Sequence, residues 1–329
     1  MSGMFAGVDL GGTKIACGLA DAAGHIVRTE TIPTQSHEGP DAVLARMAQL
    51  VADLCGGDKL EALGVGVPGL VDLETGTTRF LPNLPTQWRG VPAAATLRGR
   101  LGCPVLLMND CRTATLGELR YGLGRGVRDM ALFMLGTGIG GGLVIDRRLR
   151  LGPLGAAGEI GHQTILPDGP LCGCGNRGCL EALASGPAIA GEGVRLLRAG
   201  LAPRLHEIVR GNADLVSPAT MGEAARAGDG TVRDAIDRAA SYLAIGVANI
   251  VTAFHPELVV LGGGVAGLGD LMLETVRRGV KERVGMFPTD GVRVELSTLG
   301  DSAGILGAIA LAMSARRGQA RRDAAGTAE

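Results

Sequence analysis

Short apolar runs recur along this chain, and stretches with the periodicity of amphipathic helices separate them. The runs predict β-strands, because each spans four to seven residues and is bounded by glycine or polar turns. They are MFAGV, KIACGLA, LGVGV, VLLM, ALFML, GLVID and LVVLG. Strands that alternate with helices are typical of an α/β fold.

The helical stretches carry apolar residues at intervals of three and four. Residues 41–54 show this spacing and follow a proline start signal, so they predict one amphipathic helix. A longer helix is predicted from about residue 232 to 254, where His255 and Pro256 end it. Another is predicted over 304–315, and the segment beyond it lacks apolar periodicity, so we expect a solvated, frayed end.

The chain contains a weak internal repeat. FAGVDLGGTKIACGLAD and ALFMLGTGIGGGLVID share one plan: an apolar strand, a turn rich in glycine and threonine, and a second apolar strand. Nothing long separates the paired strands, so each turn is predicted to be a tight hairpin. Two copies predict two related halves that face each other, with a ligand cleft between them.

Length and composition support two domains. A chain of 329 residues exceeds the usual size of one compact core. Hydrophobic residues make up 46% but aromatic residues only 2%, so the cores must be built from aliphatic side chains. Glycine accounts for 55 residues, over twice the usual share of about 7%, and it clusters in loops after the apolar runs.

The charge balance excludes several classes of partner. The net charge is −1, which provides no general attraction to nucleic acid or to an anionic membrane. No apolar run approaches the ~20 residues of a membrane-spanning helix, and MSGMFAGVDLGG resembles no signal peptide. We therefore expect a cytoplasmic protein, in which clustered cysteines bind metal rather than form disulfides.

Two glycine-rich turns are candidate phosphate-binding loops. Gly11 and Gly12 would let backbone N–H groups approach a polyanion, Thr13 adds a hydroxyl, and Asp9 could hold Mg²⁺ directly or through water. The turn GTGIGGG at 136–142 would hold phosphate in the same way. The alternative is that both are merely tight hairpin turns.

A third glycine cluster, Gly262, Gly263 and Gly264, follows the strand LVVL. Glycines at this position can pack against a flat base such as adenine, or can simply turn the chain. Alone, the cluster does not distinguish the two.

A histidine and three cysteines are concentrated in GHQTILPDGPLCGCGNRGCLE, residues 161–181. Cys172, Cys174 and Cys179 have the spacing C-x-C-x4-C, and intervening glycines permit tight wrapping around one cation. With His162 they predict a tetrahedral Zn²⁺ site. A Cys3His set leaves no open position, so the zinc would be structural. A disulfide and unrelated surface thiols are the alternatives.

The same metal loop connects two carboxylates, Glu159 and Glu181. A metal would give rigidity to groups that recognise a ligand, and His162 could bind zinc through one ring nitrogen while presenting the other to a substrate. A further candidate is the pair Asn109 and Asp110, directly after a predicted strand, where functional residues of α/β folds often lie. Asp110 could accept a proton from a hydroxyl. The alternative is a helix N-cap or an Asx turn, and one residue can serve both purposes.

Together these motifs resemble the ROK family (repressors, open reading frames, kinases) of the actin-like ATPase superfamily. Five features match in order: DLGGTK at 9–14, GVGVPG at 64–69, ND and GE within 109–118, GTGIGGG at 136–142, and GEIGH with CGCGNRGCLE within 158–181. The resemblance covers nearly the whole chain, and its last block is the most specific.

The resemblance implies a two-domain actin-like ATPase fold, related to ribonuclease H, with a central cleft. A smaller α/β domain would span 1–120 and be joined by a C-terminal helix at 302–316. A larger α/β domain would span 121–301, and 317–329 would form a flexible tail. Closure of the two domains would exclude water from the reaction. Homodimers are common in the family, so we expect one here.

The resemblance also implies ATP-dependent phosphorylation of a hexose at its 6-hydroxyl, as in bacterial glucokinases, with glucose favoured and Asp110 as the general base. By the same resemblance, the sugar would be bound by Asn83, Asn109, Asp110, Glu159, His162 and Glu181. ATP and Mg²⁺ would be held by Asp9, Gly11, Gly12, Thr13, Lys14, Thr137 and Gly138, and the adenosine would lie against Gly262, Gly263 and Gly264.

Two departures from the family pattern bear on the sugar. Ala114-Thr115 stands where the family often has two alanines, and Leu183 gives EALASG where its glucokinases often read EAYASG. Neither removes a catalytic group. N-acetylglucosamine, N-acetylmannosamine and fructose are alternative substrates, and polyphosphate is an alternative donor.

Two alternatives are not enzymes. A sugar-responsive repressor would carry a winged helix before the kinase-like part, and DLGGTK begins at residue 9, so we do not expect one. A non-catalytic sugar-binding relative would lack the base or the phosphate-loop residues, whereas Asp9, Thr13, Asp110 and Thr137 are all present.

Overall fold

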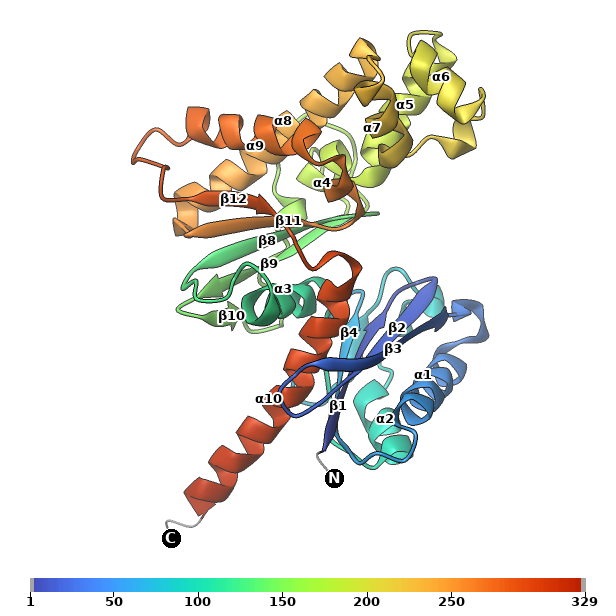
Figure 1. The fold of residues 1–329 in the computed structure, drawn as a ribbon, viewed down its shortest axis with the longest axis vertical. Helices are drawn as coiled ribbons and strands as arrows, with labels where there is room; N and C mark the ends of the chain where they lie inside the picture. The colour runs from blue at the N-terminus through green and yellow to red at the C-terminus, as the bar shows by residue number, and fades with distance from the viewer. Residues whose placement is uncertain (1–2, 327–329) are drawn as a thin grey trace. The chain divides into compact units, whose positions relative to one another are not determined.

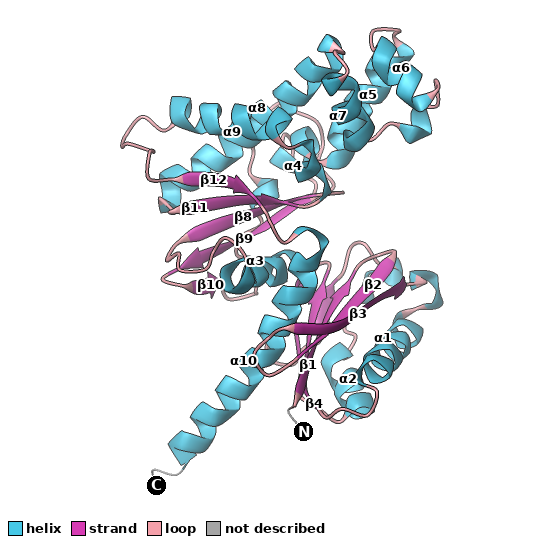
Figure 2. Cartoon of the chain, in the orientation of Figure 1, coloured by secondary structure: helices cyan, strands magenta, loops and turns pink. Residues whose placement is uncertain are grey.

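The computed structural model describes residues 3–326, which divide into two compact α/β units (Figure 1). The first unit contains the chain up to Arg125, the segment Leu149–Ala157 and the chain from Asp301 onward. The second contains Gly126–Arg148 and Gly158–Gly300. Each unit is a β-sheet flanked by helices, as Figure 2 shows.

The sheet of the first unit has the strand order β3-β2-β1-β4-β7. Its strands are β1 (Met4–Leu10), β2 (Lys14–Ala20), β3 (Ile26–Pro33), β4 (Leu60–Val67) and β7 (Val105–Asn109). The first three form antiparallel hairpins, whereas β4 and β7 run parallel to β1. The carboxyl ends of β1, β4 and β7 therefore lie at the same end of the sheet. A separate two-stranded ribbon consists of β5 (Leu70–Val71) and β6 (Thr78–Phe80).

Helices cover both faces of this first sheet (Figure 1). They are α1 (Pro40–Cys55), α2 (Ala93–Leu101), α3 (Asp110–Tyr121) and α10 (Ala303–Gly326). α1 packs against α2 and β2, while α10 packs against β1, β4 and α3. The core between α1, α2 and the sheet is mainly aliphatic, as expected from a chain poor in aromatic residues.

α10 lies unusually close to its neighbours because glycines face it. A Cβ atom on Gly64 of β4 would lie 2.0 Å from the carbonyl oxygen of Ala308. A Cβ on Gly307 of α10 would lie 1.8 Å from the carbonyl oxygen of Thr113 in α3. Any side chain at either position would force the elements apart, so these glycines hold α10 against the sheet and against the helix that carries Asp110.

α10 is also longer than the sequence indicates. The pattern predicts a helix over 304–315 followed by a frayed, flexible segment, whereas the helix continues to Gly326. Apolar periodicity reports only the part of a helix that is packed, and a helix can continue without it. The last part of the expected tail, 327–329, lies outside the described residues.

The sheet of the second unit has the order β10-β9-β8-β11-β12, which repeats the plan of the first. Its strands are β8 (Met130–Leu135), β9 (Ile139–Ile145), β10 (Arg148–Arg150), β11 (Leu258–Gly262) and β12 (Arg293–Leu296). β8 and β9 form an antiparallel hairpin, and β11 runs parallel to β8. The internal repeat predicted from the two glycine-rich hairpins is therefore present in the strand order.

The helices of the second unit pack into one large aliphatic core with its sheet. They are α4 (Leu180–Ala184), α5 (Gly186–Arg198), α6 (Pro203–Val209), α7 (Pro218–Arg226), α8 (Gly230–Phe254) and α9 (Asp270–Arg283). The buried carboxylate of Asp229 caps α8 by accepting from the N–H of Val232. His255, in a left-handed conformation before Pro256, ends the helix where the sequence predicts.

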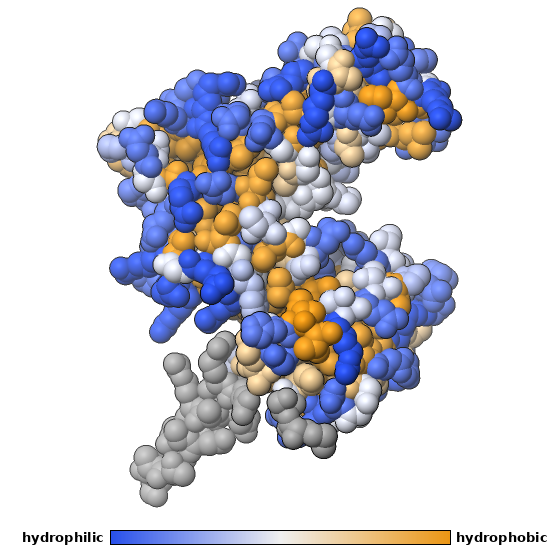
Figure 3. All heavy atoms as spheres, in the orientation of Figure 1, coloured by the Kyte–Doolittle hydropathy of each residue, from blue (hydrophilic) through white to orange (hydrophobic). Residues whose placement is uncertain are grey.

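Polar side chains cover much of each unit on the face drawn in Figure 3, with apolar residues showing between them. Within residues 3–326, none of the helices combines the length and the apolar character needed to cross a membrane.

Candidate functional site

The turn between β1 and β2 is held firmly from its inner side. The N–H of Gly11 donates to the carbonyl of Lys14 at 2.9 Å, which closes the hairpin. The buried Thr34 donates its hydroxyl to the carbonyl of Gly11 at 2.8 Å and its N–H to the carbonyl of Thr13 at 2.9 Å. The side chains of Thr13 and Lys14 remain exposed. The turn is thus rigid, with its polar side chains available to a ligand. Thr34 is a supporting residue that the sequence analysis missed.

Asn83 lies beside this turn. A Cβ atom on Gly12 would lie 3.0 Å from the carbonyl oxygen of Asn83, whose own side chain is exposed. The structure therefore brings the predicted sugar-binding Asn83 next to the predicted phosphate loop. The absence of a side chain at Gly12 permits this close approach.

Asp9 lies near the end of β1 under the start of α10. A Cβ atom on Gly304 would lie 2.5 Å from Oδ2 of Asp9. The pKa of Asp9 is raised to about 6, mainly by burial and also by the carboxylate of Asp110, while the ammonium of Lys14 partly offsets both effects. A cation bound between Asp9 and Asp110 would stabilise the ionised form of both carboxylates. The residues therefore fit the expected Mg²⁺.

Asn109 is the N-cap of α3. Its Oδ1 accepts from the N–H groups of Cys111 and Arg112 at 3.0 and 3.2 Å, and from Nη1 of Arg112 at 2.9 Å. Its Nδ2 donates to the carbonyl of Gly69 at 3.2 Å. The amide oxygen thus serves the helix cap, so any bond from Asn109 to a sugar hydroxyl would use the remaining N–H of Nδ2.

Asp110 is the first residue of α3 and is partly buried. Its Oδ1 accepts from the N–H of Cys111 at 2.8 Å. A carboxylate in the first turn of a helix is stabilised by the helix dipole, so both the capping interpretation and a functional role are compatible with this geometry. The carboxylate of Asp110 raises the pKa of Asp9, so the two acids lie near each other at the carboxyl ends of the parallel strands of the first sheet.

Arg112 is a second residue that sequence reasoning missed. It is 1% exposed, whereas arginine is rarely fully buried unless its charge is paired. Besides Asn109, it donates to the carbonyls of Ala156 and Ala157. No local signal reveals this, because the acceptors lie more than forty residues away in sequence.

The second glycine-rich turn joins β8 to β9 and contains Thr137 and Gly138. The N–H of Gly136 donates to the carbonyl of Gly138 at 2.9 Å, and the carbonyl of Gly136 accepts from the N–H of Gly186 at the start of α5. Thr137 is exposed. The turn therefore has the same organisation as the first: fixed from behind, with a free threonine at its tip.

Glu181 of α4 lies against this second turn. Its Oε2 accepts from the N–H of Ile139 at 2.9 Å, and a Cβ atom on Gly138 would lie 2.4 Å from the same oxygen. The predicted sugar-binding Glu181 and the predicted phosphate-binding Gly138 are therefore in direct contact.

The third glycine cluster divides into two parts. Gly262 is buried at the end of β11, where a Cβ would lie 3.0 Å from the sulfur of Met134. Gly263 and Gly264 are exposed, and space around Gly264 is open. A Cβ on Gly263 would lie 2.5 Å from the carbonyl oxygen of Leu135, so this loop lies beside the end of β8. Only the last two glycines offer a surface to a base.

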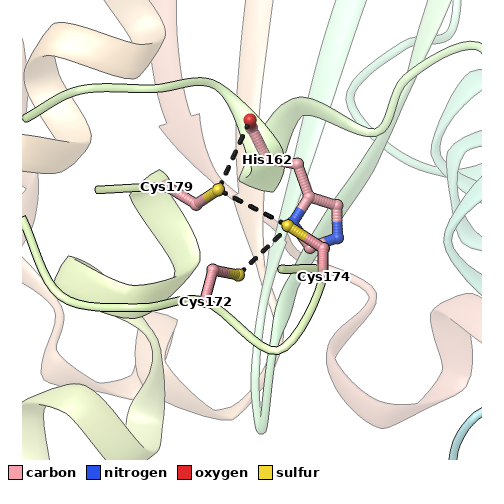
Figure 4. Close-up of side chains that lie close together, drawn as sticks. All are labelled: His162, Cys172, Cys174 and Cys179. Atoms are coloured by element: carbon pink, nitrogen blue, oxygen red, sulfur yellow. Dashed lines mark hydrogen bonds between the residues drawn. The ribbon is translucent and has the colours of Figure 1, made fainter. Parts of the chain in front are cut away.

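The four predicted metal ligands converge, as Figure 4 shows. Donor atoms of His162, Cys172, Cys174 and Cys179 all lie within 4.8 Å of one another. Sγ of Cys174 is 3.7 Å from Sγ of Cys179, and Sγ of Cys172 is 3.6 Å from Nδ1 of His162. A tetrahedral zinc site requires S···S and S···N separations of about 3.8 and about 3.6 Å. The donor set therefore fits Zn²⁺.

The electrostatics of these thiols support the same conclusion. Burial raises the pKa of Cys172 to about 12 and also raises the pKa of Cys179, while a backbone N–H at Asn176 lowers the pKa of the exposed Cys174. Buried thiolates need a cation beside them, and a coordinating metal provides one. None of the seven cysteines forms a disulfide.

His162 connects the cysteines to Glu159. Its Nδ1 faces Cys172, whereas its Nε2 lies 3.9 Å from Oε2 of Glu159, whose side chain is 43% exposed. The two ring nitrogens thus face in different directions, as expected for a histidine that binds metal on one side and leaves the other for a ligand.

The chain is similar to known sugar kinases over most of its length. The ROK family model matches residues 5–315. A glucokinase of Streptomyces coelicolor is 36% identical over 315 residues, which covers 94% of this chain and 98% of that protein. A glucokinase of Thermotoga maritima is 37% identical over 308 residues, 93% of this chain and 96% of that protein.

A solved structure gives the same likeness. The ROK family glucokinase of Streptomyces griseus, in complex with glucose and AMPPNP, is 36% identical and matches with a TM-score of 0.83. The match covers 95% of this chain and all of that one. Together with the repeated strand order of the two units, it confirms the predicted α/β actin-like ATPase fold.

Proposed function

Because this chain belongs to the ROK family, we propose that it transfers a phosphoryl group from ATP to the 6-hydroxyl of a hexose, with glucose as the preferred sugar. The chain is an ATP-dependent sugar kinase by its similarity to glucokinases along almost its whole length. The observation that carries the finer proposal is the likeness to a glucokinase that holds glucose and AMPPNP together.

In this proposal Asp110 is the general base. Its Oδ1 accepts from the N–H of Cys111 at the start of α3, which orients the carboxylate that would accept the proton of the sugar hydroxyl. Phosphoryl transfer depends mainly on positioning and on stabilisation of charge, so a base held by a helix end is well suited to the reaction.

The two glycine-rich turns would bind the phosphates of ATP. The first presents Gly11, Gly12, Thr13 and Lys14 in one unit, and the second presents Thr137 and Gly138 in the other. Asp9 would hold Mg²⁺, which supplies positive charge to the phosphate oxygens when bound. Gly263 and Gly264 would lie against the adenosine, with Gly262 packed behind them.

The sugar would be recognised by carboxylates and amides. Asn83 and Asn109 belong to the first unit, and Glu159, His162 and Glu181 to the second. His162, Cys172, Cys174 and Cys179 would hold a structural Zn²⁺, whose contribution is rigidity. A bound metal would then limit the movement of Glu159, just before His162, and of Glu181, just after Cys179.

The experiment is a coupled ADP-release assay with Mg-ATP against glucose, mannose, fructose, glucosamine, N-acetylglucosamine and N-acetylmannosamine. Preference for glucose supports the proposal and shows that Leu183 is compatible with a glucose site. Preference for an N-acetylated sugar keeps the kinase assignment and rejects glucose. Direct measurement of the sugar phosphate, with polyphosphate in place of ATP, identifies the donor, because transfer from polyphosphate releases no ADP.

The expected homodimer and cytoplasmic location stay predictions. Light scattering coupled to gel filtration measures the mass of the assembly directly, and a mass of one chain would reject the dimer.

A further inference from the structure

The buried guanidinium of Arg112 is an ion that neither phosphate binding nor base catalysis uses. It lies within α3 and is 1% exposed, and burial of a charge is costly unless hydrogen bonds compensate for it. The burial of this charge is therefore best explained by the groups to which the guanidinium donates hydrogen bonds.

Three of its donors have acceptors within the first unit. Nη1 donates to Oδ1 of Asn109 at 2.9 Å, Nη2 to the carbonyl of Ala156 at 2.9 Å, and Nε to the carbonyl of Ala157 at 3.0 Å. The planar fork of arginine presents donors in fixed directions, so one side chain fixes all three acceptors relative to one another.

The first acceptor lies on the element that carries the base. Asn109 caps α3, and the N–H of Cys111 is shared between Oδ1 of Asn109 and Oδ1 of Asp110. Rotation of the Asn109 amide would therefore disturb the same N–H group that orients the Asp110 carboxylate.

The other two acceptors lie where the chain leaves the first unit. Leu149–Ala157 belongs to that unit and Gly158 begins the next segment of the second, with a φ of 97° that favours glycine. The segment is closed on itself by the N–H of Ala157, which donates to the carbonyl of Leu151 at 2.9 Å. Glu159 follows two residues after the anchored carbonyl of Ala157.

We propose that Arg112 is a positioning residue that fixes the start of the Asp110 helix and the chain leading into Glu159 with one guanidinium. The inference rests on the proposed function, because it assigns Asp110 and Glu159 to the sugar. Arg112 itself acts through Asn109, Ala156 and Ala157.

The test compares Arg112→Met and Arg112→Lys with wild type by steady-state kinetics well below their melting temperatures. Methionine removes all three donors. Lysine keeps the charge but cannot reproduce the fork. We expect Arg112→Met to lower kcat by about tenfold and to raise the glucose KM by about tenfold, with the ATP KM nearly unchanged, as for lost supporting contacts. Arg112→Lys should be intermediate.

Leu97→Ala is the matched control, since Leu97 is fully buried in α2 of the same unit and its loss destabilises without touching these contacts. If the Arg112 variants lower only the melting temperature, as this control should, Arg112 has a structural role and the proposal is overturned.

Hydrogen exchange separates this outcome from failure of the proposed function. Peptides covering 149–157 should exchange faster in Arg112→Lys and Arg112→Met, while those of the β1–β2 hairpin should not change. Unchanged exchange in 149–157 would overturn the proposal that Arg112 fixes this segment. A wild-type protein that phosphorylates no sugar in the panel would overturn the proposed function instead. The exchange result would still show whether Arg112 fixes the segment 149–157.

Discussion

Oε1 of Glu181 lies 3.6 Å from Sγ of Cys172, while Oε2 of the same carboxylate accepts from the N–H of Ile139. One side chain therefore connects the cluster of His162 and the three cysteines to the second glycine-rich turn. A metal bound at Cys172 would limit the movement of Glu181. Glu181 in turn supports the turn that carries Thr137 and Gly138.

Removal of one metal ligand should affect both metal content and sugar binding. Cys174→Ser replaces the exposed thiol, so it changes packing very little. We expect zinc to fall from about one per chain to nearly none, and the glucose KM to rise by about tenfold. Elemental analysis and kinetics on the same preparation measure the two effects. Cys55→Ala, in α1 of the other unit, should retain its zinc. Full zinc content in Cys174→Ser would reject the cluster.

The contact between Gly138 and Glu181 can be tested by adding one methyl group. In Gly138→Ala the new Cβ would lie 2.4 Å from Oε2 of Glu181, so the carboxylate must move and lose its bond to Ile139. We expect kcat/KM for glucose to fall by about 100-fold. Gly191→Ala in α5 is the matched control, because a Cβ there has nothing within 4 Å. Its activity should equal that of wild type, with slightly higher stability. Equal activity of both variants would contradict the account.

Asp9 should make the protein less stable as the pH rises from acid. Burial raises its folded pKa from 3.8 to about 6, so between these values the folded state binds more protons than the unfolded state. Stability then falls as the pH rises through this interval, by about 2 to 3 kcal/mol, and the loss is complete above pH 6.

Asp9→Asn removes this dependence. In Mg²⁺-free buffer the variant should be more stable than wild type at pH 7.5 and close to it at pH 4.5, as measured by urea unfolding, and it should lose kinase activity. A variant that is no more stable than wild type at pH 7.5 would show that ionisation of the buried Asp9 does not destabilise the folded protein. Unchanged activity would leave the first turn without its metal-binding residue.

The sequence predicts the elements whose pattern is local. The paired apolar strands around Gly11-Gly12 and around Gly138 predict two hairpins. The same strand order is present in both units, as these two similar hairpins indicate. The convergence of the four candidate metal ligands is predictable for the same reason, since the three cysteines lie within one short loop.

The features that the sequence does not predict depend on distant contacts or on exposure. β3 is the edge strand of its sheet and is exposed along most of its length, so it has no buried alternation to detect. Leu149–Ala157 follows β9 in sequence but belongs to the first unit, where the carbonyls of Ala156 and Ala157 meet Arg112. Nothing local to either segment indicates that pairing.

The role of Asp110 is the central claim, and Asp110→Asn tests it most directly. We expect kcat to fall by about 1,000-fold, because the amide cannot accept the proton of the sugar hydroxyl, while the Kd for glucose measured by calorimetry changes by less than about threefold. Asp234→Asn, an exposed carboxylate on α8, controls for the loss of one charge and should match wild type. A kcat near the wild-type value in Asp110→Asn would contradict the account and remove Asp110 as the base.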